Sequence, residues 1–227
     1  LYIYHVNQLV FMLEGHQKYK VGFFISSESW INYQKWHYEI SKALYARGHE
    51  VSIITAKSYR IYTKSKRYGM HVYPYKKRRL LLRSIIQLTR IFRKESISTL
   101  FINSPKDLKK ASIAAKLAGV DKVIYRRGTV SSVKTSYINR LIFSRLISDV
   151  ITNSDANRNI MIGNKNTVYN NNQINVIYNG LNLGHFDKKL APAHDYRKNG
   201  ELLVGLLAGH FRNDRFLRLL QMIQREQ

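Results

Sequence analysis

The sequence contains no cysteine. This absence excludes disulfide bonds, thiolate nucleophiles and cysteine-ligated metals, and it suits a reducing cytosol. The sequence also lacks an apolar run of the roughly eighteen residues that a membrane-spanning helix requires. Residues 1–18 have no basic start followed by a clean apolar stretch, so they make a poor signal peptide and stay an unassigned N-terminal extension.

Acidic residues are scarce. The chain has 38 Lys and Arg against 14 Asp and Glu, which gives a net charge of +24 over 227 residues. Such a charge creates a strong positive field, so we expect an anionic partner. Nucleic acid, acidic lipid and phosphorylated small molecules all fit, and charge alone does not choose among them. The hydrophobic share of 44% is enough for a proper core.

Buried-strand patterns alternate with helical patterns along the chain. Residues 20–26 and 49–55 are apolar runs typical of strands buried on both faces. Between them, apolar positions recur at helical spacing over residues 33–47, and a glycine follows as a stop. The further predicted strands are 70–75, 99–103, 122–125, 149–153 and 174–178, and the further predicted helices are 80–94, 106–118, 136–147 and 155–162. This order predicts an α/β fold with a doubly wound parallel sheet and ligands beyond the carboxyl ends of its strands.

Four segments together carry a resemblance to a known family. They are YARGHEVSIIT (45–55), SPKDLKKASIAAKLAGVDKVIYRRG (104–128), DVITNSDANRNIM (149–161) and INVIYNGLNLGHF (174–186). In order and spacing they are similar to successive blocks of glycosyltransferase family 4, over about residues 20–216. The last block resembles the Asn-Gly signature at which the chain of that family leaves its N-terminal domain.

The resemblance implies a GT-B fold, in which two Rossmann-like domains face each other across the active site. It implies an acceptor-side Rossmann-like domain over residues 19–186, a linker over 187–200 and the start of a donor-binding domain over 201–227. The paired glutamates of the family's donor motif are absent, so we expect a truncated transferase with little or no activity alone.

The resemblance also implies the chemistry. Family members transfer a sugar from a nucleotide-sugar donor, usually with retention at the anomeric carbon and without a metal. The histidines of this sequence show no paired spacing suited to a metal site, so we expect no metal and no other cofactor. The nucleotide sugar and a glycan or glycolipid acceptor are the expected partners.

Polar residues near two predicted helix starts are candidates for acceptor binding. By the resemblance, Gln34 and Lys35 fall where acceptor-binding residues commonly lie, although a solvated first turn of a helix explains them equally well. Asn103 stands where many relatives have a histidine; it can hydrogen-bond a sugar but cannot act as a general base. Lys106 and Asp107 follow at a helix start that can hold an anion, or they form a cap with a surface charge.

A sharper candidate is the sequence Arg126-Arg127-Gly128 at the end of a predicted buried strand. We expect both guanidiniums to point into the ligand crevice, where each can bind a phosphate or carboxylate through two hydrogen bonds. The alternative is a solvated pair. By analogy, relatives with this block suggest lipopolysaccharide or a similar phosphorylated acceptor.

The donor diphosphate has its own candidate loop. By position, Gly209, His210 and Arg215 replace the residues of the family loop that clasps the diphosphate of the donor. Gly209 lets the backbone approach a phosphate, and Arg215 keeps the charge. An ordinary strand-to-helix turn is the competing interpretation.

A very basic helical segment accounts for much of the charge. Residues 76–94 contain eight cations and no acid, together with apolar residues available for burial. The candidate membrane-facing residues are Lys76, Lys77, Arg78, Arg79, Arg83 and Arg90. Each cation contributes on the order of 1 kcal/mol near an acidic membrane. The segment therefore predicts a cytoplasmic protein that is peripheral at the inner face of the cell membrane, unless its charged face is only solvated.

Two classes of function remain. The first is a glycosyltransferase, or its acceptor-binding part, that extends a lipid-linked or cell-surface glycan. The second is a non-catalytic basic α/β module that binds acidic membrane or nucleic acid. Sixteen tyrosines among the basic residues favour single-strand binding. The sequence has no nucleic-acid-binding motif, and many tyrosines lie inside predicted elements, so the four blocks favour the enzyme.

Overall fold

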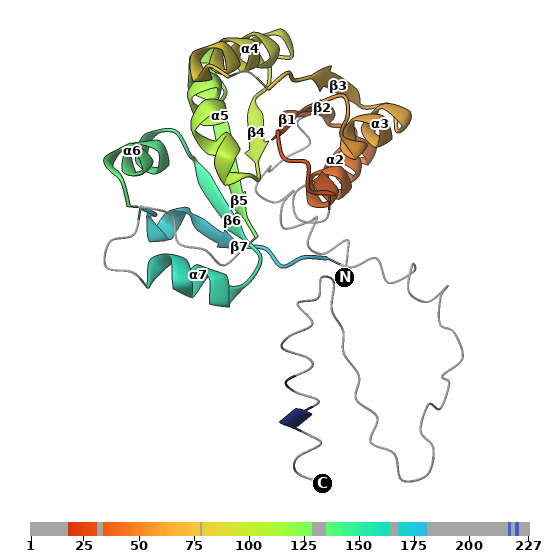
Figure 1. The fold of residues 1–227 in the computed structure, drawn as a ribbon. Coiled ribbons are helices and arrows are strands. Elements are labelled where there is room, and N and C mark those ends of the chain that lie inside the picture. Colours follow the sequence, from red (N-terminus) through yellow and green to blue (C-terminus); the bar gives the residue numbers. More distant parts are fainter. Residues whose placement is uncertain are drawn as a thin grey trace, which may run out of the picture. The chain divides into compact units, whose positions relative to one another are not determined.

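A seven-stranded parallel sheet forms the centre of the fold (Figure 1). This computed structural model describes residues 18–30, 34–77, 79–128, 135–163, 168–180, 218 and 221–222. The strands are β1 Lys20–Ile25, β2 Glu50–Thr55, β3 His71–Pro74, β4 Thr99–Ile102, β5 Lys122–Arg127, β6 Asp149–Thr152 and β7 Ile174–Val176. The helices are α2 Lys35–Ala46, α3 Arg60–Arg67, α4 Leu81–Lys94, α5 Pro105–Ala118, α6 Tyr137–Arg145 and α7 Asp155–Ile162, and a short 3₁₀ turn, η2, spans Asn171–Gln173.

The strand order β3-β2-β1-β4-β5-β6-β7 reverses direction once. The chain builds from β1 outward to β3, returns to β4 on the other side of β1, and then runs to the opposite edge. The reversal between β1 and β4 is the switch point at which ligands bind in open parallel sheets. The predicted doubly wound parallel sheet is confirmed.

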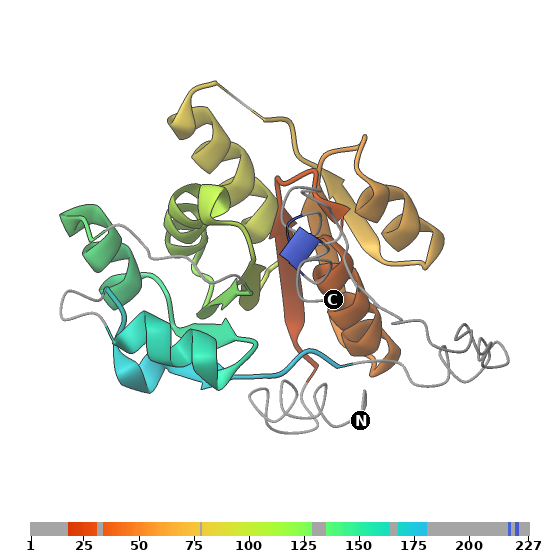
Figure 2. The same ribbon diagram turned by 60° about the horizontal axis from the view of Figure 1, so that its bottom comes forward.

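Helices cover both faces of the sheet (Figures 1 and 2). One core contains buried residues of α4, α5, α6 and α7, among them Leu88, Ala111, Phe143 and Met161. The other core packs Ile40 and Leu44 of α2 and residues of α3 against the opposite face. This two-layer burial explains why the strands are apolar on both sides.

Local sequence explains most of the element ends. Gly48 and Gly119 take positive φ angles of 83° and 80° just after α2 and α5, as the sequence pattern predicts. Ser136 and Ser154 precede α6 and α7, and each hydroxyl accepts a hydrogen bond from a backbone N–H of the first turn. The strand β5 continues to Arg127, two residues beyond its predicted end, and β7 stops two residues early.

The helix α3 is absent from the sequence prediction. Its eight residues, RIYTKSKR, bury only Ile61 and Ser65, so the apolar period is too sparse to identify a helix. Cation–π contacts with Trp30 help to stabilise α3, because Arg60 and Lys64 lie over this ring at 5.0 and 5.2 Å from its centroid.

The chain divides into two compact units, Leu1–Leu183 and Gly184–Gln227. The sheet and its helices belong to the first unit. The predicted linker and the start of a donor-binding domain lie almost wholly outside the described residues, so these boundaries stay predictions.

Candidate functional site

The candidate site lies at the carboxyl ends of the central strands. Ile102 of β4 pairs with Tyr125 of β5, so the next residues, Asn103 and Arg126, are neighbours across the two strands. Both are buried. Parallel pairing therefore brings together side chains that are 23 positions apart in the sequence, beside the switch point between β1 and β4.

Arg126 is the centre of this site. Its Nη1 donates to Oδ1 of Asn103 at 3.2 Å, and its Nη2 donates to Oδ1 of Asn179 at 3.0 Å. The guanidinium carbon lies 4.5 Å from the ring centroid of Trp36. Arg126 is only 6% exposed, and no carboxylate among the described residues forms an ion pair with it. Burial lowers its pKa to about 10, so the group is a cation at neutral pH that is held by neutral partners.

Arg127 lies on the other face of the sheet. Successive side chains of a strand point to opposite faces, and the charge of Arg127 acts on Tyr169, whose ring packs against Phe143 of α6 with 4.7 Å between the centroids. The structure therefore separates the two arginines, and the prediction that both guanidiniums share one crevice is wrong. The prediction ended β5 at Tyr125 and so missed the alternation.

Gly128 matters because of its missing side chain. A Cβ atom at this position would lie 2.7 Å from Nη1 of Arg126, which is closer than real Cβ contacts allow. Its carbonyl accepts a hydrogen bond from Nδ2 of Asn153 at 3.4 Å. The glycine thus leaves room for the guanidinium at the end of β5.

His37 follows Trp36 on α2 and is fully buried. Neither ring nitrogen has a hydrogen-bond partner among the described residues. The ring packs edge-on against Phe23 of β1, with 5.3 Å between the centroids. Burial, with the positive charge of Arg126, lowers the pKa of His37 well below its usual value, so the imidazole is neutral at neutral pH.

Gln34 has a different place from the one predicted. It is buried, and its Nε2 donates to the carbonyls of Ser27 and Glu28 at 2.9 Å each. Its Oε1 accepts from the backbone N–H of Ile61 at 3.2 Å. The amide therefore braces the loop after β1 and is not a solvated helix turn, and its role in acceptor binding stays a prediction. Lys35 is exposed at the start of α2, and its role in acceptor binding stays a prediction.

Asp107 is also engaged within the chain. Its carboxylate accepts hydrogen bonds from the backbone N–H of Ser26 at 2.8 Å and from the Ser26 hydroxyl, and it pairs with Lys110 at 2.8 Å. These contacts join the end of β1 to the first turn of α5, so the carboxylate is structural. Lys106 is exposed beside it, and its contact with an anion stays a prediction.

The basic helix exposes apolar residues as well as cations. Ile85 and Leu88 of α4 pack into the core, whereas Leu81, Leu82 and Ile86 are exposed, Leu82 by 67%. The exposed residues of this surface, here called the α4 face, are Lys76, Lys77, Arg79, Leu80, Leu81, Leu82, Arg83, Ile86 and Arg90; Arg78 lies outside the described residues. A hollow of about 710 Å³ adjoins it, lined by Tyr73, Pro74, Arg83, Ile86, Gln87, Arg90, Ile91 and Lys94.

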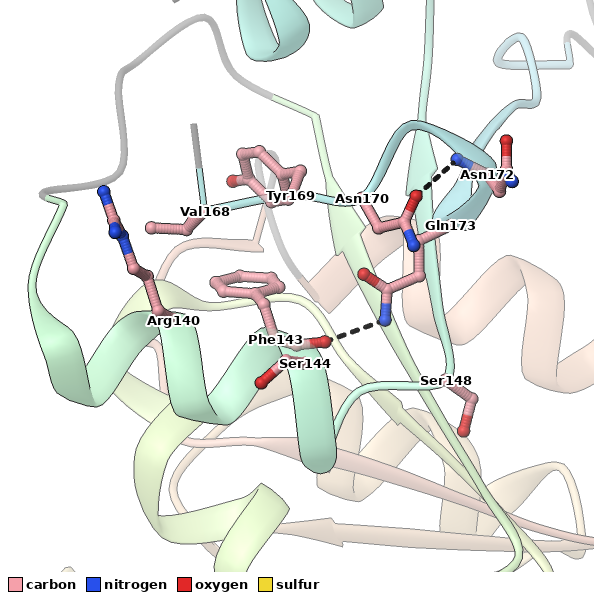
Figure 3. A pocket seen from close by; sticks show the side chains of 9 residues that line it. All are labelled: Arg140, Phe143, Ser144, Ser148, Val168, Tyr169, Asn170, Asn172 and Gln173. Carbon is pink, nitrogen blue, oxygen red and sulfur yellow. Dashed lines mark hydrogen bonds between the residues drawn. The ribbon is translucent and has the colours of Figure 1, made fainter. Parts of the chain in front are cut away.

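A second hollow, of about 440 Å³, lies between α6 and the segment before β7 (Figure 3). Its polar side chains bond within the chain: Nε2 of Gln173 donates to the carbonyl of Phe143 at 2.8 Å, and Oδ1 of Asn170 accepts from the backbone N–H of Asn172 at 3.1 Å. Gln173 and Ser148 precede β7 and β6, so this hollow lies at the amino ends of the strands, away from Arg126.

The described residues contain no cluster of His, Asp and Glu suited to a metal ion. No helix in the same part of the chain is long and apolar enough to span a membrane. The candidate donor loop with Gly209, His210 and Arg215 lies outside the described residues, so its role stays a prediction.

Sequence reasoning missed three members of the site. Trp36 lay among the apolar positions of the predicted helix over residues 33–47. His37 was considered only with the other histidines as a possible metal ligand, and Asn179 only as part of the Asn-Gly signature. Asn179 had the clearest signal, because it stands in the Asn-Gly block. No local pattern indicates that its amide reaches a guanidinium 53 positions away.

Comparisons with known proteins agree with this architecture. A model of Glycosyltransferase Family 4 matches residues 35–185, whereas no curated protein matches the chain. A glycosyltransferase from Rickettsia africae ESF-5 has a similar fold, with a TM-score of 0.66 and 16% identity over 78% of this chain and 47% of that chain. Anabaena Alr3699/HepE in complex with UDP and glucose has a TM-score of 0.59 and 17% identity over 73% and 46% of the two chains. This chain thus spans about half the length of the solved structures that it matches.

Proposed function

This chain belongs to glycosyltransferase family 4, and we propose that its described residues form the acceptor-side half of a sugar-transfer site. The donor is a nucleotide sugar, and the acceptor is a lipid-linked or cell-surface glycan such as lipopolysaccharide. The observation that carries this proposal is the polar cluster at the carboxyl ends of β4 and β5, where Arg126 and the amides of Asn103 and Asn179 converge. Such groups hydrogen-bond the oxygens of sugars and phosphates.

The described half of the site has no group placed to act as a general base. The Asp107 carboxylate bonds Ser26 and Lys110, and His37 is buried against Phe23. Transfer with retention at the anomeric carbon, without a metal, is compatible with this lack. The donor then needs groups from outside the described residues, and Gly209, His210 and Arg215 are the proposed contacts for its diphosphate.

The nature of the donor is supported by the similar structures. Anabaena Alr3699/HepE has been solved with UDP and glucose and with UDP-glucose, and this chain has its fold over 73% and 72% of its length. We extend a nucleotide-sugar donor to this chain by analogy.

A membrane-associated acceptor is supported by the α4 face. Exposed leucines lie beside exposed cations there, which is the composition of helices that lie in a membrane interface. Acidic headgroups attract the cations, by on the order of 1 kcal/mol each. We therefore place the protein at the cytoplasmic face of the cell membrane. A non-catalytic membrane-binding module would share this face but has no need of the polar cluster around Arg126.

Sedimentation with lipid vesicles and thermal shift test the proposal on the 227-residue chain. Vesicles rich in phosphatidylglycerol should pellet the chain, whereas phosphatidylcholine vesicles should not. Replacing Leu81 and Leu82 by Ser should weaken the pelleting, and replacing the exposed Leu117 of α5 by Ser is the matched control.

The acceptor half is tested with solubilised lipopolysaccharide and with nucleotide sugars. A rise in melting temperature with the glycolipid supports the assignment. Stabilisation by nucleotide sugars alone, with no response to any glycan or glycolipid, would overturn it.

A further inference from the structure

We propose that Arg126 binds an anionic group of the acceptor, a phosphate or a carboxylate, and that the amide oxygen of Asn179 occupies the position that this group takes. The proposal deepens the proposed function, on which it rests only in calling the ligand an acceptor. The anion site itself depends solely on the groups around Arg126.

The first argument concerns charge. A buried guanidinium normally has a carboxylate or phosphate partner, because removing an unpaired cation from water is costly. Arg126 instead has two neutral amide oxygens and an indole ring among the described residues. Burial disfavours its charged form and lowers its pKa to about 10, yet at neutral pH the group stays protonated. An anion would supply the missing charge.

The second argument concerns the neighbourhood. Lys110 and Ser26 already hold Asp107, the acidic residue at the adjacent start of α5. His37, the other titratable group beside Arg126, is neutral at neutral pH. The local charge is therefore positive, and no acidic side chain among the described residues forms an ion pair with the guanidinium in place of an incoming anion.

The third argument concerns shape. Trp36 covers one face of the guanidinium, which directs hydrogen bonding to its edge. Gly128 has no Cβ atom to crowd Nη1. The planar edge of the guanidinium, where the two amide oxygens bind, matches the two oxygens of a phosphate or carboxylate.

The two amide partners are not equivalent. Asn103 directly follows β4 and is held beside Arg126 by the strand register. Asn179 lies three residues beyond the end of β7, in a segment without regular secondary structure. Its hydrogen bond to Nη2 is between a cation and a neutral acceptor, and a charged oxygen forms a stronger bond to the same donor. Asn179 is therefore the partner that an anion replaces.

Four variants of the full chain test the proposal in a titration with methyl phosphate and with glucuronate at constant ionic strength. Arg126→Gln should bind the preferred anion at least about tenfold more weakly than the unmodified chain, which corresponds to the loss of a charge-assisted pair. Arg127→Gln is the matched control, because it removes an equal charge from the other face of the sheet and should bind within about twofold.

The Asn179 variants separate ligand binding from a structural role. Asn179→Ala should bind the anion more tightly, because the competing amide is gone. Asn179→Asp should lose binding and raise the melting temperature, because its carboxylate pairs with Arg126. A merely structural amide would give lower melting temperatures in both variants and unchanged anion binding.

The proposal is overturned if Arg126→Gln and Arg127→Gln bind both anions equally, since the positive surface then accounts for the binding. It is also overturned if Asn179→Asp binds the anions like the unmodified chain. This second test does not need the Arg126→Gln variant and can be made even if that variant does not fold. Preference for methyl phosphate or for glucuronate identifies the anion. The titration contains no nucleotide sugar, so anion binding at Arg126 can be detected even if the chain transfers no sugar. The anion site and the proposed function can therefore fail separately.

Discussion

The guanidinium of Arg126 lies over the indole ring of Trp36, with 4.5 Å between the guanidinium carbon and the ring centroid. The two residues come from β5 and α2, so one cation–π contact joins the second half of the sheet to the helix that follows β1. Trp36 also lies 6.3 Å from the ring of Phe101 on β4. The position of Arg126 thus depends on three separate elements.

Replacing Trp36 by Leu should destabilise the fold by about 1–2 kcal/mol beyond the effect of lost area, because a buried cation loses its π partner. Trp36→Phe should retain part of that contact and lie between the two. Urea unfolding at pH 7 measures the difference. Equal stability of the Leu and Phe variants would show that the indole only fills space.

The burial of His37 makes a prediction about pH. Its pKa is lowered in the folded state, so the unfolded chain takes up the proton more readily. Its contribution to stability is present above pH 6.5 and is lost as the pH falls below that value. His37→Phe, which can keep the edge-on contact with Phe23, should lose less stability between pH 6.5 and 4.5 than the unmodified chain. Parallel stability curves for the two proteins in that window would contradict this account.

Asp107 should be among the most sensitive charged residues of the first unit. Asp107→Asn removes the negative partner of Lys110 from a buried ion pair and replaces one of two acceptor oxygens by an amide donor, at a cost of about 3–5 kcal/mol. Lys106→Gln, one position earlier on the exposed side of α5, should change stability by less than about 0.5 kcal/mol. Chemical denaturation of both variants compares them directly, and similar small effects would show that the Asp107 contacts are dispensable.

A double-mutant cycle can test whether the space at Gly128 is needed for the guanidinium of Arg126. Gly128→Ala brings a Cβ atom to 2.7 Å from Nη1 of Arg126, so either the guanidinium moves or β5 is distorted. We expect weaker anion binding and a loss of stability of about 1–3 kcal/mol, as for other overpacked sites. In the Arg126→Gln background most of that loss should disappear, because the shorter side chain removes the clash. If Gly128→Ala costs the same stability in the Arg126→Gln background as in the unmodified chain, the strain lies in the backbone and not at the guanidinium.

Much of the fold could be predicted from the sequence because the strands are buried on both faces. A continuous apolar run marks β1, and the positive-φ glycines Gly48 and Gly119 mark the ends of α2 and α5. The short helix α3 was missed because its charged residues hide a two-residue buried face, and its stabilising contact with Trp30 is not local.

The candidate site was predictable only in part. Asn103 and Arg126 were identified because each ends a strand, where ligands collect in parallel sheets. The burial of Gln34 and Asp107 was not predicted, because both stand at helix starts, where the sequence does not show that they hydrogen-bond the loop after β1. The contact between Arg126 and Asn179 depends on the pairing of three successive strands, β5, β6 and β7, which no local pattern encodes.

The central claim is that an anion replaces Asn179 at Arg126. Its most direct test is an NMR titration with methyl phosphate that follows the side-chain amide signals of Asn179 and Asn103 together with the Nε–H of Arg126. We expect the Asn179 and Arg126 signals to shift and saturate with one common Kd, while the Asn103 signal moves little. Shifts confined to the cations of the α4 face, with Arg126 and Asn179 unchanged, would contradict the account.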